Sequence, residues 1–329
     1  MRVMVTGGNG FVGSAVVGEL LDRGHEVRCL VRERSDCRRL GGRAIEKVVG
    51  DVRDVQSLKM AAQGTQAVVH LACLSSWSEL DSPLLEEVAI EGTRHVVDAA
   101  LLAGCRRLVF VSSIAAVGAT SRPIVQDEET HFSLPPDRFR YACAKAAGEA
   151  ICFAAQERGL QVVVVNPGEV YGPGDVGLIT ASTLVDFARS WLVLVCSGGT
   201  NIVHVDDVAR GIVAALERGR SGERYILGGD NVTIAELARL TLDLVGQSHK
   251  WRVRVPSWLL RAAAALARLF HLPFPVPLAT VPYATRYWMM SSRKAKEELQ
   301  VSFRNARSTL SPTIDWLCKS GLVQASKEG

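Results

Sequence analysis

The first thirteen residues, MRVMVTGGNGFVG, constrain the fold of this chain more than any other stretch. Residues 3–5 predict a short buried strand, a glycine-rich turn follows, and apolar residues at helical spacing from Val12 predict a helix. Glycines allow a tight turn and a close approach to a pyrophosphate, and the helix N-terminus supplies free N–H groups. The spacing is G-x-x-G-x-x-G rather than the commonest dinucleotide fingerprint, and glycine also serves plain turns. The strand before it and the helix after it favour a nucleotide site.

Length and composition limit the class of protein. At 329 residues, with 48% apolar and 22% charged residues, the chain predicts one large α/β domain and a smaller lobe. The net charge of +4 is dispersed, which argues against a nucleic-acid partner. The eight cysteines form no C-x-x-C pair or zinc-type spacing, so we expect reduced, mostly buried thiols and no metal. A strand that begins at residue 2 leaves no room for a signal peptide, and no apolar run is long enough for a transmembrane span, so we expect a cytoplasmic protein.

The next three predicted strands each end in candidate cofactor contacts. The strand 26–31 leads into Arg32, where a doubly wound fold places the residue that meets the adenosine ribose. Arg32 and the arginines after it favour a 2′-phosphate and therefore NADP, although Glu33 is compatible with NAD and a solvated charged loop is the alternative. The strand 44–49 ends at Asp51, which could equally cap the next helix, and the strand 67–70 ends at 71–73.

A serine pair, a tyrosine and a lysine form the candidate catalytic group. The predicted strand 106–111 delivers Ser112 and Ser113, and Tyr141 and Lys145 lie at i, i+4 near the start of a long helix. A lysine cation beside the phenol is expected to lower the tyrosine pKa towards neutrality and make it a general acid and base, while a serine hydroxyl holds the substrate oxygen. The alternative is a surface pair with a snorkelling lysine.

These stretches resemble the extended short-chain dehydrogenase/reductase family, also described as NAD-dependent epimerases and dehydratases. TGGNGFVG, GDV, HLAC, SSIAAVG, YACAK, NPGEVYGP and VHVDDVA occur in the family's order, and the branch most similar is that of dihydroflavonol reductases and hopanoid-associated sugar epimerases. The resemblance implies a Rossmann-type, doubly wound parallel sheet with a smaller C-terminal substrate lobe. It assigns the catalytic roles to Ser113, Tyr141 and Lys145, and it implies a homodimer.

The resemblance also assigns cofactor contacts, with Asp51 meeting the adenine and 71–73 running along the cofactor. The complete set of cofactor-binding residues it implies is Gly7, Asn9, Gly10, Phe11, Val12, Gly13, Arg32, Asp51, Val52, Leu71, Ala72, Cys73, Ser112, Tyr141, Lys145, Pro167, Gly168 and Val170. The chain departs from the family in three respects, the first being that Ala144 replaces the Ser or Thr that many relatives have before the lysine of YACAK. Ile114-Ala115 replaces the Asp-Glu pair of the sugar-nucleotide dehydratases, and AIEGT lacks the asparagine of NVxGT.

The C-terminal half is expected to alternate between two lobes. We predict a dinucleotide-binding domain over 1–173 with a return segment over 201–229, and a substrate lobe over 174–200 and 230–323. Asp206 is a candidate N-cap, His204 has a structural role, and Thr233 and Glu236 form a capping box. The apolar stretch 251–290, with Arg261 and Arg268 on its polar side, predicts a helix packed on the small lobe, or a lid or peripheral membrane contact.

The sequence thus predicts an NADP-dependent oxidoreductase acting on a carbonyl or secondary alcohol. Arg189 is the only cation within 177–196, so the substrate is expected to be apolar rather than a nucleotide. A nucleotide-sugar epimerase is the alternative, because Arg189, Arg210 and Arg224 could converge in space. A cofactor-sensing protein without catalysis is a third class, but such proteins usually lack the tyrosine or the lysine.

Overall fold

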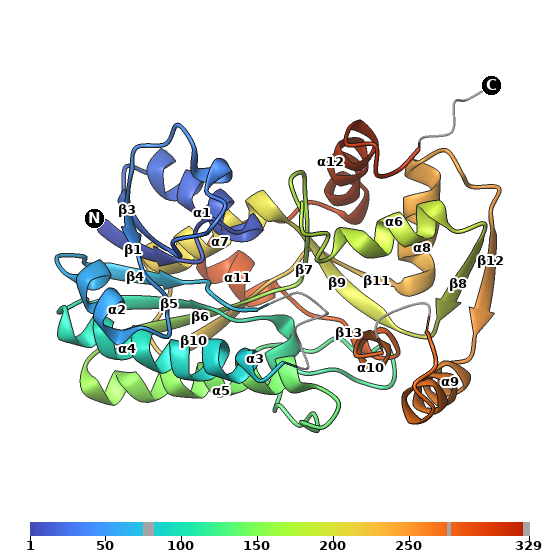
Figure 1. Ribbon diagram of the computed structural model, residues 1–329, viewed down its shortest axis with the longest axis horizontal. Helices are drawn as coiled ribbons and strands as arrows, with labels where there is room; N and C mark the ends of the chain where they lie inside the picture. The colour runs from blue at the N-terminus through green and yellow to red at the C-terminus, as the bar shows by residue number, and fades with distance from the viewer. Residues whose placement is uncertain (75–81, 275–277, 325–329) are drawn as a thin grey trace.

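The computed structural model of the chain describes residues 1–74, 82–274 and 278–324. Within these residues, a seven-stranded sheet lies at one end of the molecule and smaller sheets lie towards the other (Figure 1). The large sheet has the order β10-β6-β5-β4-β1-β2-β3, and all its pairings are parallel. This doubly wound order, which reverses between β1 and β4, confirms the predicted Rossmann-like fold. Its strands are β1 (Arg2–Thr6), β2 (Glu26–Val31), β3 (Ile45–Val49), β4 (Ala67–His70), β5 (Arg107–Val111), β6 (Gln161–Pro167) and β10 (Glu223–Leu227).

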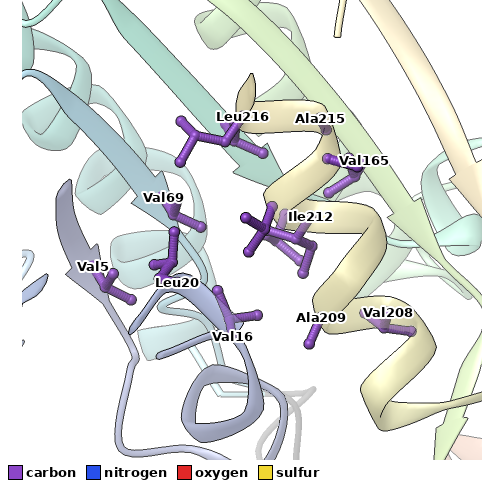
Figure 2. Close-up of a cluster of buried hydrophobic side chains, with 14 of the residues drawn as sticks. Val5, Val16, Leu20, Val69, Val165, Val208, Ala209, Ile212, Ala215 and Leu216 are labelled. Atoms are coloured by element: carbon purple, nitrogen blue, oxygen red, sulfur yellow. The ribbon is translucent and has the colours of Figure 1, made fainter. Parts of the chain in front are cut away.

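Helices cover both faces of the large sheet, because its strands are apolar on both sides. In β1, Val3 and Val5 contribute to one buried cluster and Met4 to the other. One face packs on α1 (Phe11–Asp22), α7 (Val205–Arg218) and α11 (Arg293–Glu298). The other packs on α2 (Val55–Ala62), α4 (Gly92–Leu102) and α5 (Arg140–Ala154). Figure 2 shows Val16 and Leu20 of α1 facing Ile212 and Leu216 of α7.

Shorter strands and helices form the end of the molecule away from the large sheet (Figure 1). One small sheet has the order β11-β9-β13, with β7 also paired to β9, and a separate pair joins β8 and β12. The strands are β7 (Glu169–Tyr171), β8 (Leu192–Cys196), β9 (Gly199–His204), β11 (Asp230–Thr233), β12 (Trp251–Val255) and β13 (Tyr287–Trp288). The helices are α6 (Ala181–Arg189), α8 (Ile234–Leu244), α9 (Ser257–Leu269), α10 (Thr280–Ala284) and α12 (Ala306–Lys319). No helix in the described ranges is long and apolar enough to cross a membrane.

The observed elements follow the predicted ones closely, with local differences. The helical segment that contains AIEGT is divided into α3 (Leu84–Glu86), a π-helical turn over Glu87–Glu91, and α4. Gly92 opens α4 where an added Cβ would lie 2.9 Å from Val52, so α4 can approach the sheet closely there. All eight cysteines are free, but only three are fully buried, fewer than expected.

The start of α7 corrects one predicted cap and one predicted boundary. His204, not Asp206, is the N-cap, because its side chain accepts the N–H of Asp206 at 3.2 Å. His204 is buried, which fits its predicted structural role, and Thr233 forms the predicted capping box with Glu236. Residues 199–204 pair within the small sheet, so the chain returns to the large sheet at Val205 rather than at 201.

Asn201 lies where the chain passes between the two sheets. Its buried Nδ2 donates to the Gly229 carbonyl and to Asn231 Oδ1. A Cβ added at Gly168 would lie 2.6 Å from the Asn201 carbonyl oxygen, and one at Gly228 would lie 2.2 Å from its Oδ1. Gly168 separates β6 of the large sheet from β7 of the small one, and 228–229 separate β10 from β11. The crossings therefore pack around one amide side chain and leave no room for other side chains.

Candidate functional site

The glycine turn after β1 has the geometry that a pyrophosphate requires. Gly7 has a φ of +70°, which side chains disfavour, and a Cβ at Gly13 would lie 2.1 Å from the Gly7 carbonyl oxygen. Gly10 precedes α1 and provides no side-chain cap. The N–H groups of the first turn, Phe11 to Gly13, have no partner within the helix, so they remain available to an anion. The turn could therefore bind the pyrophosphate of a dinucleotide through backbone N–H groups rather than through charged side chains.

The loop after β2 forms a hollow beside this turn. Its cavity has a volume of about 490 Å³ and is lined by Arg32, Glu33, Arg34 and Ser35. Asn9 Nδ2 donates to the Asp36 carbonyl at 3.3 Å, which links the turn to the loop. Arg32 forms no ion pair with any other described residue, so its guanidinium is available to a ligand phosphate.

The neighbouring arginines of that loop have partners of their own. Arg38 pairs with Asp36 at 2.7 Å and lowers the pKa of that carboxyl to about 2. Arg39 donates to the Gly174 carbonyl. Of the arginines in the predicted cluster, Arg32 and Arg34 line the hollow, whereas the guanidinium groups of Arg38 and Arg39 have partners elsewhere.

Asp51 lies at the carboxyl end of β3 and does not cap the next helix. Its carboxylate accepts two bonds from the Arg53 guanidinium at 3.0 and 3.1 Å, and this pairing lowers its pKa. The cap of α2 is Asp54, whose side chain accepts the N–H of Gln56. Of the two alternatives for Asp51, the helix-cap role is therefore wrong. Its carboxylate and the adjacent, buried Val52 lie at the edge where the resemblance places the adenine.

A buried histidine, which the sequence analysis did not single out, orders the segment 71–73. His70 Nδ1 lies 2.6 Å from Thr6 Oγ1, and its Nε2 lies 3.1 Å from Thr93 Oγ1. The Thr93 hydroxyl donates to the Ala89 carbonyl, so it accepts the Nε2–H of His70. The Thr6 hydroxyl then donates to Nδ1 and accepts the N–H of Ala72 at 3.2 Å. Burial lowers the pKa of His70 to about 3, and the neutral ring fits this chain of donors.

The predicted catalytic residues come together at the carboxyl end of β5. Ser113 caps the short turn 114–116 by accepting the N–H of Ala115, and its side chain is hydrogen-bonded to Tyr141. Lys145 is 4% exposed, and its Nζ donates to the Val111 carbonyl at 2.9 Å. Ser112 is also buried there, and its Oγ has no hydrogen-bond partner among the described residues. The group thus brings together a phenol, a buried cation and a serine hydroxyl without a hydrogen-bond partner among the described residues.

The direction of the Tyr141 pKa corrects the prediction. Burial raises this pKa above its usual value, the nearby Cys73 raises it further, and the hydrogen bond with Ser113 acts in the opposite direction. The expected lowering by Lys145 is wrong for this structure, because desolvation of the phenol is the dominant effect and the ammonium bonds to Val111. Tyr141 therefore keeps its proton at neutral pH.

A polar chain behind Ser113 was also missed from the sequence. Asn166 Nδ2 donates to the Ser113 carbonyl at 2.9 Å and to Glu149 Oε1 at 2.7 Å. Glu149 is buried and forms an ion pair with Arg224 at 2.8 Å. Glu149 lies one helical turn beyond Lys145, and this spacing is the signal that could have identified it. These hydrogen bonds hold the backbone at Ser113, the predicted catalytic serine.

The turn after β6 holds the last predicted cofactor contacts. Pro167 ends β6, Gly168 has no space for a side chain, and Val170 belongs to β7. Glu169, between them, was not predicted as a site residue. Burial raises its pKa to about 7 although Tyr171 and Thr200 donate hydrogen bonds to it. This part of the site therefore contains a carboxyl that is partly protonated near neutral pH.

Apolar side chains surround Tyr141. Phe139, Tyr283 and Trp288 contact one another, with ring centroids 5.1 to 6.1 Å apart, and Tyr141 packs against the cluster they belong to. On another side, Tyr141 packs against a cluster with Cys73 and Leu74. Arg286 is the cation placed on this wall, with its guanidinium carbon 5.8 Å from the centre of the Phe139 ring.

The three arginines that could have formed a diphosphate site are engaged elsewhere. Arg189 of α6 donates to the Leu322 carbonyl at 3.0 Å, and Arg210 of α7 pairs with Asp207. Arg224 of β10 pairs with Glu149. Because each has a different partner on a different element, they do not combine into one anion site. Among the described residues, no three His, Cys, Asp or Glu side chains gather as a metal site.

Comparisons with known proteins agree with this architecture. The model of the NAD dependent epimerase/dehydratase family matches residues 3–228. Sterol demethylase protein B of Methylococcus capsulatus is 30% identical over 98% of this chain and 100% of its own length. A putative dihydroflavonol 4-reductase of Synechocystis sp. is 31% identical over 97% of this chain and 95% of its own. A nucleoside-diphosphate-sugar epimerase from Pseudomonas aeruginosa has a TM-score of 0.81 and 27% identity, covering 98% of this chain and 99% of its own.

Proposed function

Since this chain belongs to the NAD dependent epimerase/dehydratase family, we propose that it is an NADP-dependent oxidoreductase acting on a hydrophobic small molecule. Its reaction is the reduction of a carbonyl or the oxidation of a secondary alcohol. The observation that carries the proposal is the aromatic and aliphatic surface around Tyr141, beside which the described residues place no group of free arginines. An apolar substrate gains from such a surface, whereas a diphosphate needs cations there.

Tyr141 is the proposed proton donor. In the direction of reduction, the reduced nicotinamide supplies a hydride when it is bound. As the new C–H bond forms at the carbonyl carbon, the C=O electron pair moves to oxygen, which takes the phenol proton of Tyr141. Tyr141 holds its proton at neutral pH before the reaction, as this direction requires. In oxidation the same steps run backwards.

Ser113 and Lys145 act around that proton transfer. The Ser113 hydroxyl, hydrogen-bonded to Tyr141, can hold the substrate oxygen in line with the phenol. Lys145, buried one helical turn from Tyr141 and bonded to the Val111 carbonyl, is a proposed contact of the cofactor beside the reacting groups. Asn166 and Glu149 keep Ser113 in position through its carbonyl.

NADP is the proposed cofactor because Arg32 and Arg34 line the hollow at the end of β2. A guanidinium binds a 2′-phosphate through two parallel hydrogen bonds. The backbone turn 7–13, Asp51, and the segment 71–73 are the proposed contacts along the rest of the cofactor. We also propose the homodimer and the cytoplasmic location that the resemblance and the sequence imply, and light scattering on the purified protein tests the first.

The competing function is nucleotide-sugar epimerisation, which Arg286 beside the aromatic cluster favours. The deciding experiment adds aromatic, polycyclic and long-chain ketones and alcohols, and separately UDP-sugars, to the enzyme with NADP or NADPH. We expect the apolar compounds to change the nicotinamide absorbance. Inversion of a UDP-sugar without net change in nicotinamide would instead identify an epimerase. Tight NADP binding with no turnover of any compound would support a cofactor-sensing protein.

A further inference from the structure

Helix α9 presents its large apolar side chains to solvent. Trp258 is 67% exposed, Leu266 55% and Leu269 69%, whereas the residues it buries are Ala264 and Ala267. At 100° per residue, the three large side chains lie within one stripe of the helix, and the two alanines lie outside it. The usual arrangement, with the larger apolar side chains against the core, is therefore reversed in this helix.

The strand pair β8 and β12 extends this apolar surface. Val253 is in register with Leu194, and Trp251 with Leu192, so their side chains share one face of the pair. Trp251 is 78% exposed, and Trp191, just before β8, is 85% exposed. Ser257, the first residue of α9, donates to the Ser197 carbonyl, which joins α9 to the end of β8. Figure 1 shows α9, β8 and β12 together at the end of the molecule away from the large sheet.

The charged side chains of the segment that contains β12 and α9 are all positive. No Asp or Glu occurs between Asp243 and Glu297 in the sequence. Arg252, Arg254, Arg261 and Arg268 all lie within that interval, and none of them forms an ion pair with another described residue. Arg261 and Arg268 are seven residues apart, so they share one edge of α9 beside the apolar stripe. The exposed Trp258 indole, with the unpaired Arg261 and Arg268 beside it, complements a lipid interface that carries negative charge.

We propose that α9 and the β8–β12 pair form a docking surface for the face of an anionic phospholipid bilayer. The 13-residue helix lies in the plane of the interface, since it is too short to span the bilayer. The apolar stripe enters the headgroup region, and the arginines contact lipid phosphates. A second copy of the chain fits this surface less well, because a two-fold contact would place the same unpaired arginines opposite each other.

The test is flotation of the full-length protein with phosphatidylcholine vesicles, either pure or mixed in equal parts with phosphatidylglycerol. We expect binding to the mixed vesicles that weakens with added salt, and at least tenfold weaker binding to the pure ones. Trp258→Ser/Leu269→Ser and Arg261→Gln/Arg268→Gln should each weaken binding to the mixed vesicles at least tenfold. Matched controls are Met60→Ser/Leu102→Ser and Arg106→Gln/Arg122→Gln, which alter exposed residues outside the docking surface and should bind like the wild type.

Three outcomes would overturn the proposal. The first is that the wild type fails to float with the mixed vesicles, and the second is that it binds both kinds of vesicle equally. The third is that the control variants lose as much binding as the docking-surface variants. Sedimentation velocity on the same proteins examines the other occupant. A wild-type dimer that separates only in Trp258→Ser/Leu269→Ser, without vesicle binding, would make this surface a contact between copies. Circular dichroism verifies that every variant is folded, and no cofactor or substrate is present, so the result is independent of the proposed oxidoreductase activity.

Discussion

Helices α7 and α9 have similar lengths and opposite relations to the protein. Ten of the 14 residues of α7 are buried between α1 and the large sheet, whereas two of the 13 residues of α9 are buried. Both carry apolar residues at helical spacing, so the periodicity alone does not indicate what covers the stripe. The difference is that α7 follows a chain crossing that brings it onto a sheet apolar on both faces, while α9 continues from an exposed edge strand. The core of the large sheet includes α7, whereas the core of the smaller lobe leaves α9 outside it.

The largest expected effect concerns the chemistry, whose proposed catalytic residues Ser113, Tyr141 and Lys145 lie beside the large sheet. Tyr141→Phe removes the proton donor and should reduce turnover by about 10²–10³-fold while NADP still binds. Leu266→Ala on α9 should leave turnover of a small, water-soluble ketone unchanged. Steady-state rates and fluorescence titration of the cofactor measure both quantities. Near-normal turnover in Tyr141→Phe would refute the site assignment.

The second prediction compares the stability of the two helices directly. Ile212→Ala in α7 should lower the free energy of unfolding by about 2–5 kcal/mol, because the side chain is fully buried and leaves a cavity. Leu266→Ala in α9 should change it by less than about 0.5 kcal/mol, since that side chain is half exposed. Urea denaturation provides both values. A large loss in Leu266→Ala would mean that α9 is part of a core after all.

The third prediction compares an arginine of each half. Arg32→Ala should weaken NADP binding by about 10–100-fold, the range expected for a lost charge-assisted hydrogen bond, and should change NAD binding little. Arg268→Ala, in the docking surface, should alter neither dissociation constant. Calorimetric titration with each nucleotide is the measurement. Equal losses of affinity for NADP and NAD would show that Arg32 does not bind the 2′-phosphate.

The smallest effect is a pH dependence. His70 has a folded pKa of about 3 against an ordinary 6.5, so the unfolded state binds one more proton between these values. Stability from His70 is therefore lost as pH falls from about 6.5, by about 1.4 kcal/mol per unit. The raised pKa of Glu169 acts in the opposite direction, with stability falling as pH rises towards 7, so the wild type must be compared with a variant.

His70→Asn should remove that slope, and His271→Asn, at the exposed end beyond α9, should retain it. Denaturation curves between about pH 5 and 6.5 give the slopes. The same slope in all three proteins would show that His70 is not held neutral.

Most of the large sheet and the outline of the site were predictable from sequence, because both depend on local patterns. β2 and β4 have the predicted boundaries, and Ser113 lies hydrogen-bonded to Tyr141, which shares α5 with Lys145. What could not be predicted depends on contacts between distant segments. Glu149 reaches Ser113 only through Asn166, and His70 has its partners on β1 and α4. The predicted direction of the Tyr141 pKa shift was wrong, because the sequence shows a nearby lysine but not the extent to which the phenol is buried.

The packing around Asn201 limits how the two halves can move. The chain passes between the sheets at several places, and the crossings at 168 and 228–229 both contact this one side chain. A rotation that separated the two halves would require coordinated changes of the backbone angles at these positions. An ordinary hinge instead involves a few residues whose backbone angles change independently. We therefore expect the two halves to move little relative to each other. Entry of a substrate would then depend on side chains and loops at the rim of the site rather than on rotation of a whole domain.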